Sequence, residues 1–270
     1  MAGITVVREA DDPLAPAPRR LVLLGASNVV RGLHVVLREA RAAWGDLEVL
    51  GAIGLGRSYG WRSSVLGRVL PGIIESGIWS ELARRPRRPT RAIVTDVGND
   101  LLYNAPVAEI VRWVATCVAR LRALDAEVVV TGLPLARAER LSTAGYALLR
   151  TVVFPRHRWM PRAEALERAH DLNASLRGLA AEAGATFFAP DDAWYGLDPI
   201  HIQVGAWGRA WASILAGRMA ERAEAGRPLG ALTAVRLAAA RPERQWLFGR
   251  EQSQAQPVVT LRGGTSLSLY

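Results

Sequence analysis

The chain has 270 residues, and half of them are hydrophobic, which excludes a mainly disordered protein because so apolar a chain can bury a core. Its formal net charge is +9 at pH 7, carried by arginine because the sequence contains no lysine. The densest basic cluster, residues 84–91, is broken by two prolines, as in a solvated loop, so we expect no nucleic-acid partner. The single cysteine, Cys117, has no disulfide partner within the chain, and we expect it to be buried as a small hydrophobe.

The N-terminal residues 1–19 are expected to form an extension ahead of the folded core. They are rich in proline and include Asp11 and Asp12, unlike a secretory signal. The first apolar run of the core, residues 21–26, is far too short to span a bilayer. We therefore expect a cytoplasmic protein without a membrane span, and the sequence carries no signal for an oligomeric state.

In chain order, apolar runs bounded by turn residues alternate with segments of helical periodicity. The expected strands are short and rich in valine, isoleucine or leucine, and they cover residues 20–24, 48–53, 92–97, 127–131 and 185–188. The expected helices cover residues 29–43, 63–76, 108–124, 163–183 and 206–225. This alternation is typical of βαβ units, so it predicts an α/β domain with a parallel sheet over residues 20–225.

Two segments stand outside this alternation. Residues 135–161, before the fifth strand, form an insert with several apolar and aromatic side chains. Loops at this edge of an α/β sheet commonly cover a ligand site. The sequence of the insert is compatible with a lid over such a site and with ordinary packing against the core. The tail, residues 226–270, contains a short apolar helix, a polar stretch at 252–256 and two brief strands about Gly263-Gly264 that predict a hairpin. Its role is not indicated by the sequence.

Ser27 follows the first strand and opens a helix, which places its hydroxyl at the carboxyl edge of the sheet. A serine hydroxyl is a poor nucleophile unless a base takes its proton and donors hold the oxyanion formed on attack. Taken alone, Ser27 also fits an ordinary helix cap.

Asp198 and His201 lie in the loop after the fifth strand, which returns to the same edge. A carboxylate three residues before a histidine can accept from the imidazole Nδ1 and leave Nε2 facing a serine. Taken alone, such a pair can equally be a structural loop contact.

Two further groups follow the second and third strands. Asn99, in the run from Asp96 to Asp100, offers a side-chain amide at this edge, and Gly56 offers a backbone amide that no side chain obstructs. Both could donate to an oxyanion, and each taken alone is a turn residue.

The order Ser, Gly, Asn and Asp-x-x-His, each after a strand of one parallel sheet, resembles the SGNH (GDSL-like) hydrolase family. The resemblance implies that Ser27 is the nucleophile, His201 its base and Asp198 the acid that orients the base. It also implies an oxyanion hole made by the amides of Ser27 and Gly56 and the side chain of Asn99.

The resemblance covers about residues 21–209 and implies a flavodoxin-like three-layer α/β/α sandwich with five parallel strands in the order 2-1-3-4-5. It implies a small-molecule acyl ester as substrate, cleaved by an esterase or deacetylase through an acyl-enzyme, with no metal and no cofactor. Two positions depart from the family pattern. Ala26 replaces the aspartate before the serine, which bears on how the turn is braced, and Val97 replaces a glycine.

Three alternatives remain open on the sequence. An O-acyltransferase would use the same acyl-enzyme, and a non-catalytic SGNH-like module would only bind its ligand. A nucleotide-binding Rossmann oxidoreductase would also open with a glycine turn before a helix. Against it, the second strand ends in Ile53 and Gly54 rather than an acidic residue, and a chain without lysine cannot form a Tyr-x-x-x-Lys pair.

Overall fold

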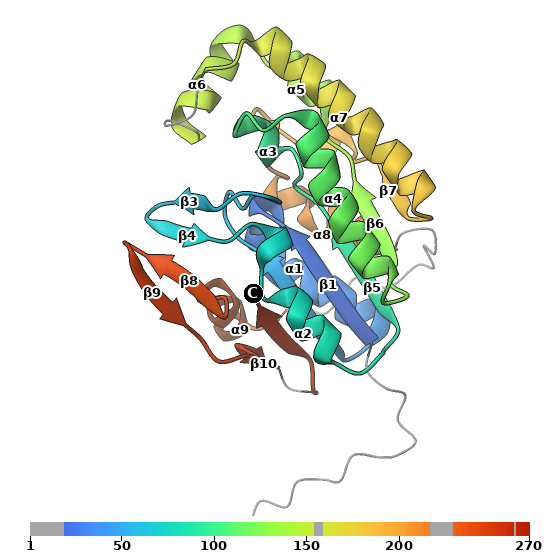
Figure 1. Cartoon of the computed structure of the whole chain (residues 1–270). Helices are drawn as coiled ribbons and strands as arrows, with labels where there is room; N and C mark the ends of the chain where they lie inside the picture. The colour runs from blue at the N-terminus through green and yellow to red at the C-terminus, as the bar shows by residue number, and fades with distance from the viewer. Residues whose placement is uncertain (1–18, 154–158, 217–228, 262) are drawn as a thin grey trace, which may run out of the picture.

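The computed structural model describes residues 19–153, 159–216, 229–261 and 263–270. They form a mixed α/β structure in which helices flank a central, mostly parallel sheet (Figure 1). The sheet has seven strands in the order β10-β11-β2-β1-β5-β6-β7. Their bounds are β1 Arg19–Gly25, β2 Leu47–Ile53, β5 Thr90–Val94, β6 Glu127–Thr131, β7 Thr186–Phe188, β10 Val259–Thr260 and β11 Ser266–Leu269.

The five strands expected from the sequence are all present and parallel, and among themselves they keep the order 2-1-3-4-5. The expected strand count is nevertheless wrong, because the tail adds two strands at the edge beside β2. Strand β11 pairs parallel to β2, and β10 pairs antiparallel to β11, with Val259 opposite Leu267. Burial of Leu267 and Leu269 against the sheet accounts for this addition. The hairpin expected about Gly263-Gly264 is thereby confirmed.

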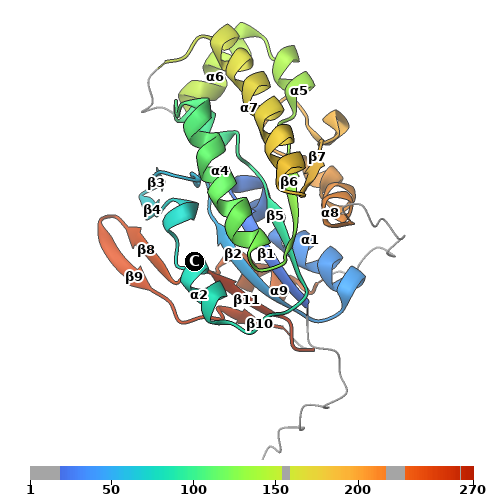
Figure 2. The ribbon, with the colours of Figure 1, turned by 45° about the vertical axis from the view of Figure 1, so that its right-hand side comes forward.

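Alternate residues of the central strands face two separate cores, as a sheet covered on both sides requires. Leu21 and Leu23 of β1 belong to the core under α1 (Ser27–Trp44), α8 (Trp207–Ala216) and α9 (Ala231–Ala238). Val22 and Leu24 belong to the core under α2 (Ile78–Arg84), α4 (Val107–Arg122) and α7 (Arg162–Glu182). The two helix layers lie on opposite sides of the sheet (Figure 2).

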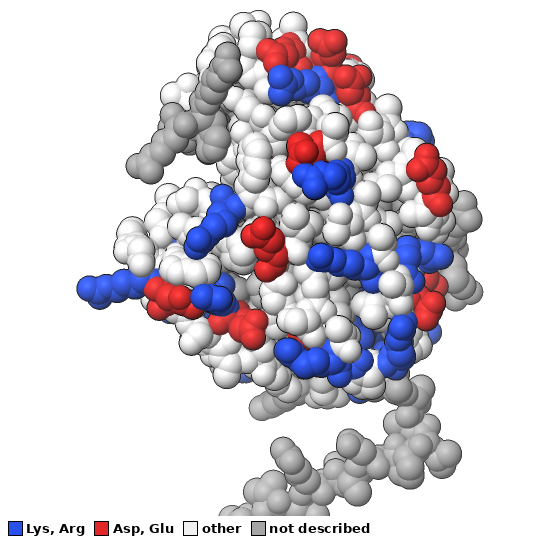
Figure 3. All heavy atoms as spheres, viewed as in Figure 1, with Lys and Arg blue, Asp and Glu red and all other residues white. Residues whose placement is uncertain are grey.

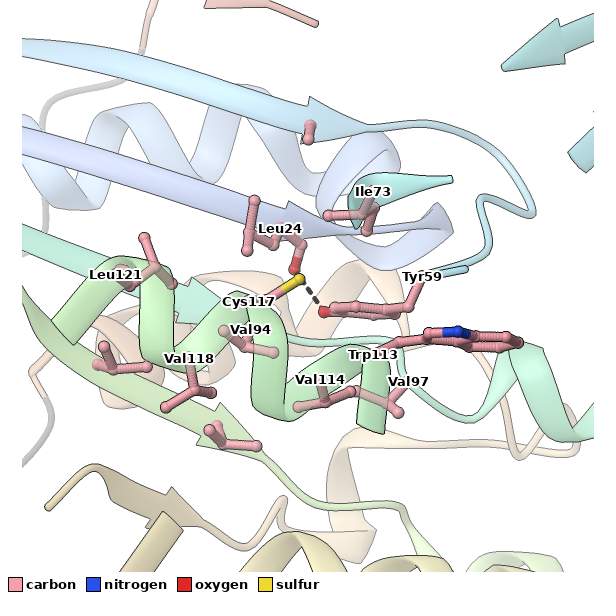
Figure 4. Packing of buried hydrophobic residues seen from close by; sticks show 14 of the residues in the cluster. Leu24, Tyr59, Ile73, Val94, Val97, Trp113, Val114, Cys117, Val118 and Leu121 are labelled. Carbon is pink, nitrogen blue, oxygen red and sulfur yellow. Dashed lines mark hydrogen bonds between the residues drawn. The ribbon is translucent and has the colours of Figure 1, made fainter. Parts of the chain in front are cut away.

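Figure 4 shows how α4 packs onto β1 and β5. The side chains of Trp113, Val114, Cys117, Val118 and Leu121 are buried along one stripe of this helix. Burial raises the pKa of Cys117 to about 12, so the thiol stays neutral and packs as the small hydrophobe that was expected.

The expected helix over residues 63–76 is wrong. This segment forms β3 (Ser63–Val65), β4 (Arg68–Leu70) and a short 3₁₀ turn, η1 (Ile73–Glu75). Leu66 and Gly67 both have positive φ, 51° and 77°, and join β3 to β4 as a hairpin. The apolar spacing looked helical, but Gly67 and Pro71 both oppose a continuous helix.

A second sheet joins this hairpin to the tail in the order β3-β4-β8-β9. Strands β8 (Arg244–Leu247) and β9 (Arg250–Ser253) were not expected in the polar part of the tail. They meet at Phe248 and Gly249, whose φ values are 48° and 79°. The Phe248 ring lies so close over Gly67 that a Cβ there would be 2.4 Å from it, and the Phe248 amide donates to the Gly67 carbonyl at 2.8 Å. The two hairpin turns therefore support each other.

The insert forms two helices, α5 (Leu135–Arg140) and α6 (Thr143–Val153), and residues 154–158 lie outside the described residues. Together with α7 these helices form one end of the molecule in Figure 1. The expected helix over 206–225 is α8 as far as Ala216, and its remainder also lies outside the described residues. Across the described ranges, none of the helices has the length and apolarity needed to cross a membrane.

Basic and acidic side chains are interspersed on the face shown in Figure 3. Arginines of the basic cluster, residues 84–91, form ion pairs with acidic side chains. Arg84 and Arg85 form ion pairs with Glu81, and Arg91 pairs with Glu127. The loop expected here is shorter than the cluster and covers residues 85–89, because Arg84 ends α2 and Thr90 begins β5, and the side chain of Arg91 is only 14% exposed.

Candidate active site

The candidate residues meet at one edge of the sheet because the central strands end in register. Gly25, at the end of β1, pairs with Ile53, at the end of β2, and Leu24 pairs with Val94 of β5. The segments that follow these strands, residues 26–28, 54–59 and 95–100, therefore start side by side.

The structure brings Ser27, His201 and Asp198 into one hydrogen-bonded chain. The Ser27 Oγ lies 3.0 Å from the His201 Nε2, and the His201 Nδ1 lies 2.6 Å from Asp198 Oδ2. Ser27 is 8% exposed, and the side chains of His201 and Asp198 are 18% and 46% exposed. The three groups are thus arranged as a base between a hydroxyl and a carboxylate, with solvent at the carboxylate end.

The Asp198 carboxylate is held in its charged form. Partial burial opposes ionisation, but hydrogen bonds from the His201 ring and from the amides of Ile200 and His201 outweigh it, so the pKa of Asp198 lies below its ordinary value. A charged Asp198 accepts from the ring Nδ1, which directs Nε2 toward Ser27.

Asp96 braces the turn that carries Ser27. Its Oδ2 accepts from the amides of Ala26 at 2.9 Å and Asn28 at 3.0 Å, the residues on either side of Ser27. Asp96 has a φ of 60°, which turns its side chain back toward β1. Burial raises the pKa of Asp96, and the hydrogen bonds that it accepts oppose this shift. Sequence reasoning missed this role, although Asp96 opens the segment that contains Asn99.

Asn28 connects the same turn to the loop of His201. Its Nδ2 donates to Asp96 Oδ1 at 2.8 Å and to the Ile200 carbonyl at 3.0 Å, and its Oδ1 accepts from the Ile202 amide at 2.8 Å. Ile200 and Ile202 stand on either side of His201. Asn28 therefore contacts the backbone next to both Ser27 and His201. No pattern in the sequence indicated this contact.

Asn99 begins the short helix α3 (Asn99–Leu102), and its amide donates to the Asp96 carbonyl at 3.3 Å. Its side-chain Nδ2 is buried and has no hydrogen-bond partner among the described residues. A buried donor without a partner is costly, so such a group is commonly kept for a ligand.

Gly56 is linked to Asn99 through Tyr103. The Tyr103 hydroxyl donates to the Gly56 carbonyl, and the Tyr103 amide donates to the Asn99 carbonyl at 3.1 Å. Gly56 has a φ of 61°, and a Cβ there would lie 2.6 Å from Val65 and 2.8 Å from the Tyr103 hydroxyl. The loop after β2 therefore requires glycine at this position.

Asp100 and Arg57 hold the rest of that loop, and both are fully buried. Asp100 accepts from the Ser58 hydroxyl and from the Tyr59 amide at 3.0 Å, and burial raises its pKa to about 6. Arg57 donates to the carbonyls of Ile53 and Tyr270, and burial lowers its pKa to about 9. Arg57 thus fixes the end of β2 to the tail.

A cavity of about 160 Å³ adjoins the hydrogen-bonded chain. Asn28 and Ile200, which are adjacent in sequence to Ser27 and His201, line this cavity. Asn99, whose side-chain Nδ2 has no hydrogen-bond partner among the described residues, lines it as well. The walls beyond are mostly apolar and include Leu133, Leu135, Ala138, Leu141, Ala165 and Leu166. The insert and α7 therefore roof an apolar space that opens beside the candidate site.

No model of a known protein family matches this chain, and no curated protein matches it. Several solved structures match this chain. The aryl esterase of M. smegmatis is 16% identical over 74% of this chain and 97% of its own, with a TM-score of 0.50. The psychrotrophic esterase EstA from Pseudoalteromonas sp. is 12% identical over 71% and 92%, with a TM-score of 0.46. AlinE4, an SGNH-hydrolase family esterase, is 16% identical over 64% and 77%, with a TM-score of 0.40.

The match to the aryl esterase shows that this chain shares its fold. The α/β fold implied by the resemblance to SGNH hydrolases is therefore confirmed, apart from the two strands that the tail adds.

Proposed function

We propose that this protein is a serine esterase of the SGNH type, which hydrolyses carboxylic esters through an acyl-enzyme. The observation that carries the proposal is the chain of two short contacts, 3.0 Å from Ser27 to His201 and 2.6 Å from His201 to Asp198. Its supports are the shared fold and the buried, unpartnered donor of Asn99.

In the first step, the Ser27 Oγ forms a bond to the ester carbonyl carbon, and its proton passes to the His201 Nε2. The carbonyl electrons move onto its oxygen. When the carbonyl re-forms, the bond to the alcohol oxygen breaks, and this oxygen takes the proton from His201. Asp198 stabilises the imidazolium between these events. Water then attacks the acyl-enzyme by the same proton transfers and releases the acid and Ser27.

The oxyanion is held by the backbone amides of Ser27 and Gly56 and by the side-chain amide of Asn99. These donors come from the segments after β1, β2 and β5, which start side by side. Because they are fixed before the substrate arrives, they favour the charged intermediate without reorganising.

A fluorophosphonate probe tests the proposal directly. We expect the wild-type protein to be labelled and to hydrolyse p-nitrophenyl acetate, while Ser27→Ala is not labelled and His201→Ala loses about 10³-fold or more in turnover. Ser80→Ala, at an exposed serine on α2, is the matched control and keeps both properties. Labelling that persists in folded Ser27→Ala overturns the proposal.

A further inference from the structure

We propose that the apolar cavity beneath α5 and α7 binds the acyl chain of the substrate, so that the insert sets which chain lengths are accepted. This proposal rests on the function proposed above and names its substrate class, esters of medium-chain aliphatic acids. It starts from the cavity, which is lined by the insert and reaches the candidate site.

The cavity is lined by Asn99, which carries one of the proposed oxyanion donors, and by residues adjacent in sequence to Ser27 and His201. Asn99 lines it with a buried Nδ2 that has no partner among the described residues, and Asn28 and Ile200 line it next to Ser27 and His201. A carbonyl oxygen held by Asn99 therefore places the neighbouring carbon of the substrate at the mouth of the cavity.

The walls fit an aliphatic chain. Leucines and alanines from α5, α7 and the segment after β6 form one apolar part of the lining, and Ile200, Ile202 and Ile214 add to it. Two charged residues line it as well, and both are bonded to protein groups. Asp96 accepts from the Ser27 turn, and Arg162 donates to the carbonyl of Leu141 at 2.7 Å. Burying one methylene group gains about 0.8 kcal/mol, or about fourfold in binding.

The acyl group fits this space better than the alcohol does. The alcohol must leave with the proton from His201, whose partner Asp198 is half-exposed to solvent. The acyl group stays bonded to Ser27 until water attacks, so it needs an enclosed site throughout the reaction. The partly enclosed apolar cavity lies under the insert and α7.

Two ester series test this proposal. We expect kcat/KM to rise about fourfold per methylene from p-nitrophenyl acetate until the cavity is full, then to fall. Alkyl acetates of increasing alcohol length are expected to give a much flatter profile. Ala165→Phe fills the cavity and shifts the acyl optimum to shorter chains, whereas Ala163→Phe, exposed on the same helix, leaves it unchanged.

A flat acyl profile in the wild type, or an optimum that does not move in Ala165→Phe, overturns the acyl site. Labelling by a short-chain fluorophosphonate separates this failure from that of the function. If Ser27 is labelled and acetate esters are cleaved, the esterase stands and only the acyl site fails. If Ser27 is not labelled in the wild-type protein, both fail.

A separate observation carries a second proposal. We infer that Asp96 and Asn28 are positioning residues that hold Ser27 and His201 at reacting distance. Asp96 bonds the amides on both sides of Ser27, and Asn28 bonds the backbone on both sides of His201. The bond between Asn28 Nδ2 and Asp96 Oδ1 joins these two braces.

Asp96 supplies the carboxylate that this chain lacks at position 26, where the SGNH pattern has an aspartate and this chain has Ala26. A carboxylate at position 26 could reach the turn from within, but here the carboxylate comes from a residue 70 positions away, after β5. The Asn28 side chain is fully used, since both of its N–H groups donate and its oxygen accepts. Loss of either residue frees the Ser27 turn from the His201 loop.

Asp96→Ala is expected to lower kcat about 10²-fold with little change in KM, since a shift of about 1 Å in reacting groups has this effect. Asp96→Asn, which keeps one acceptor oxygen, restores part of the loss. Asp46→Ala is the matched control, because Asp46 also braces a loop by accepting from Thr265 and Arg41, far from the site along the sheet. The inference fails if kcat in Asp96→Ala stays within twofold of wild type while its stability falls as in Asp46→Ala.

Discussion

The loops after β1 and β2 enter the site side by side, and each is braced by a carboxylate from the segment after β5, but the two braces differ in reach. Asp96 is half-buried and continues through Asn28 to the loop of His201. Asp100 is fully buried and stops at Ser58 and Tyr59. The first brace therefore couples the Ser27 turn to the His201 loop, whereas the second fixes the loop of Gly56, a proposed oxyanion donor, to the core.

The largest expected effect comes from removing the deeper brace. Asp100→Ala leaves the Ser58 hydroxyl and the Tyr59 amide buried without an acceptor, which costs about 3 to 5 kcal/mol of the free energy of unfolding. Urea unfolding followed by circular dichroism measures this loss. Asp96→Ala should cost less, because Asp96 is less completely buried than Asp100. Equal losses in the two variants would remove the distinction between the braces.

Asn99, the oxyanion donor proposed on this segment, can be tested without disturbing either brace. Asn99→Ala should lower kcat by about 10² to 10³. Its stability should stay close to wild type, because the Nδ2 has no partner among the described residues. Turnover of p-nitrophenyl acetate, measured beside urea unfolding, separates the two effects. Wild-type turnover in this variant would take Asn99 out of the site.

The deeper brace also predicts a pH dependence of stability. The pKa of Asp100 is about 6 in the folded protein, above its ordinary value of 3.8, so the folded state holds this proton more tightly than the unfolded chain does. This stabilisation is complete below about pH 4 and is lost as the pH rises through 6. Between pH 5 and pH 8 the loss is about 1.4 kcal/mol.

The measurement compares urea midpoints of wild type and Asp100→Asn at pH 5 and pH 8, since the variant has no proton to lose at this position. The gap between them should move in favour of Asp100→Asn as the pH rises. A gap that does not change with pH would show that Asp100 does not titrate in this range.

A last test concerns Gly56, the other proposed oxyanion donor, in the loop that the deeper brace holds. Gly56→Ala places a Cβ against Val65 and Tyr103 at a φ of 61°, which costs about 1 to 2 kcal/mol and displaces the amide proposed for the oxyanion. Gly45→Ala is the control, because Gly45 also has a positive φ, 75°, but lies in open space at the end of α1. Turnover should fall in Gly56→Ala and not in Gly45→Ala.

Much of the fold was predictable because strands buried on both faces read as continuous apolar runs. The same regularity placed Ser27, Asn99 and the Asp198 to His201 segment at one edge, since each follows such a run. The structure brings Ser27, His201 and Asp198 together, while their chemical roles remain proposals tested by the variants above.

The missed features depend on contacts that no local pattern encodes. Asp96 reaches a turn 70 residues away, and nothing in its neighbourhood distinguishes it from a turn aspartate. The hairpins at Leu66 and Phe248 use bulky residues at positive φ, which propensity disfavours. Each of these turns is stabilised by packing on the other, so neither could be predicted from its own sequence.

The pairing of β11 with β2 has a consequence for how the molecule is assembled. Residues more than 200 positions apart must find each other to complete this side of the sheet, a slow kind of contact to form. Until then β2 presents open peptide groups to which another chain could add. The same late segment brings the Tyr270 carbonyl to Arg57, next to Gly56. The segment that completes this side of the sheet therefore also ties down the loop that carries Gly56, the proposed oxyanion donor.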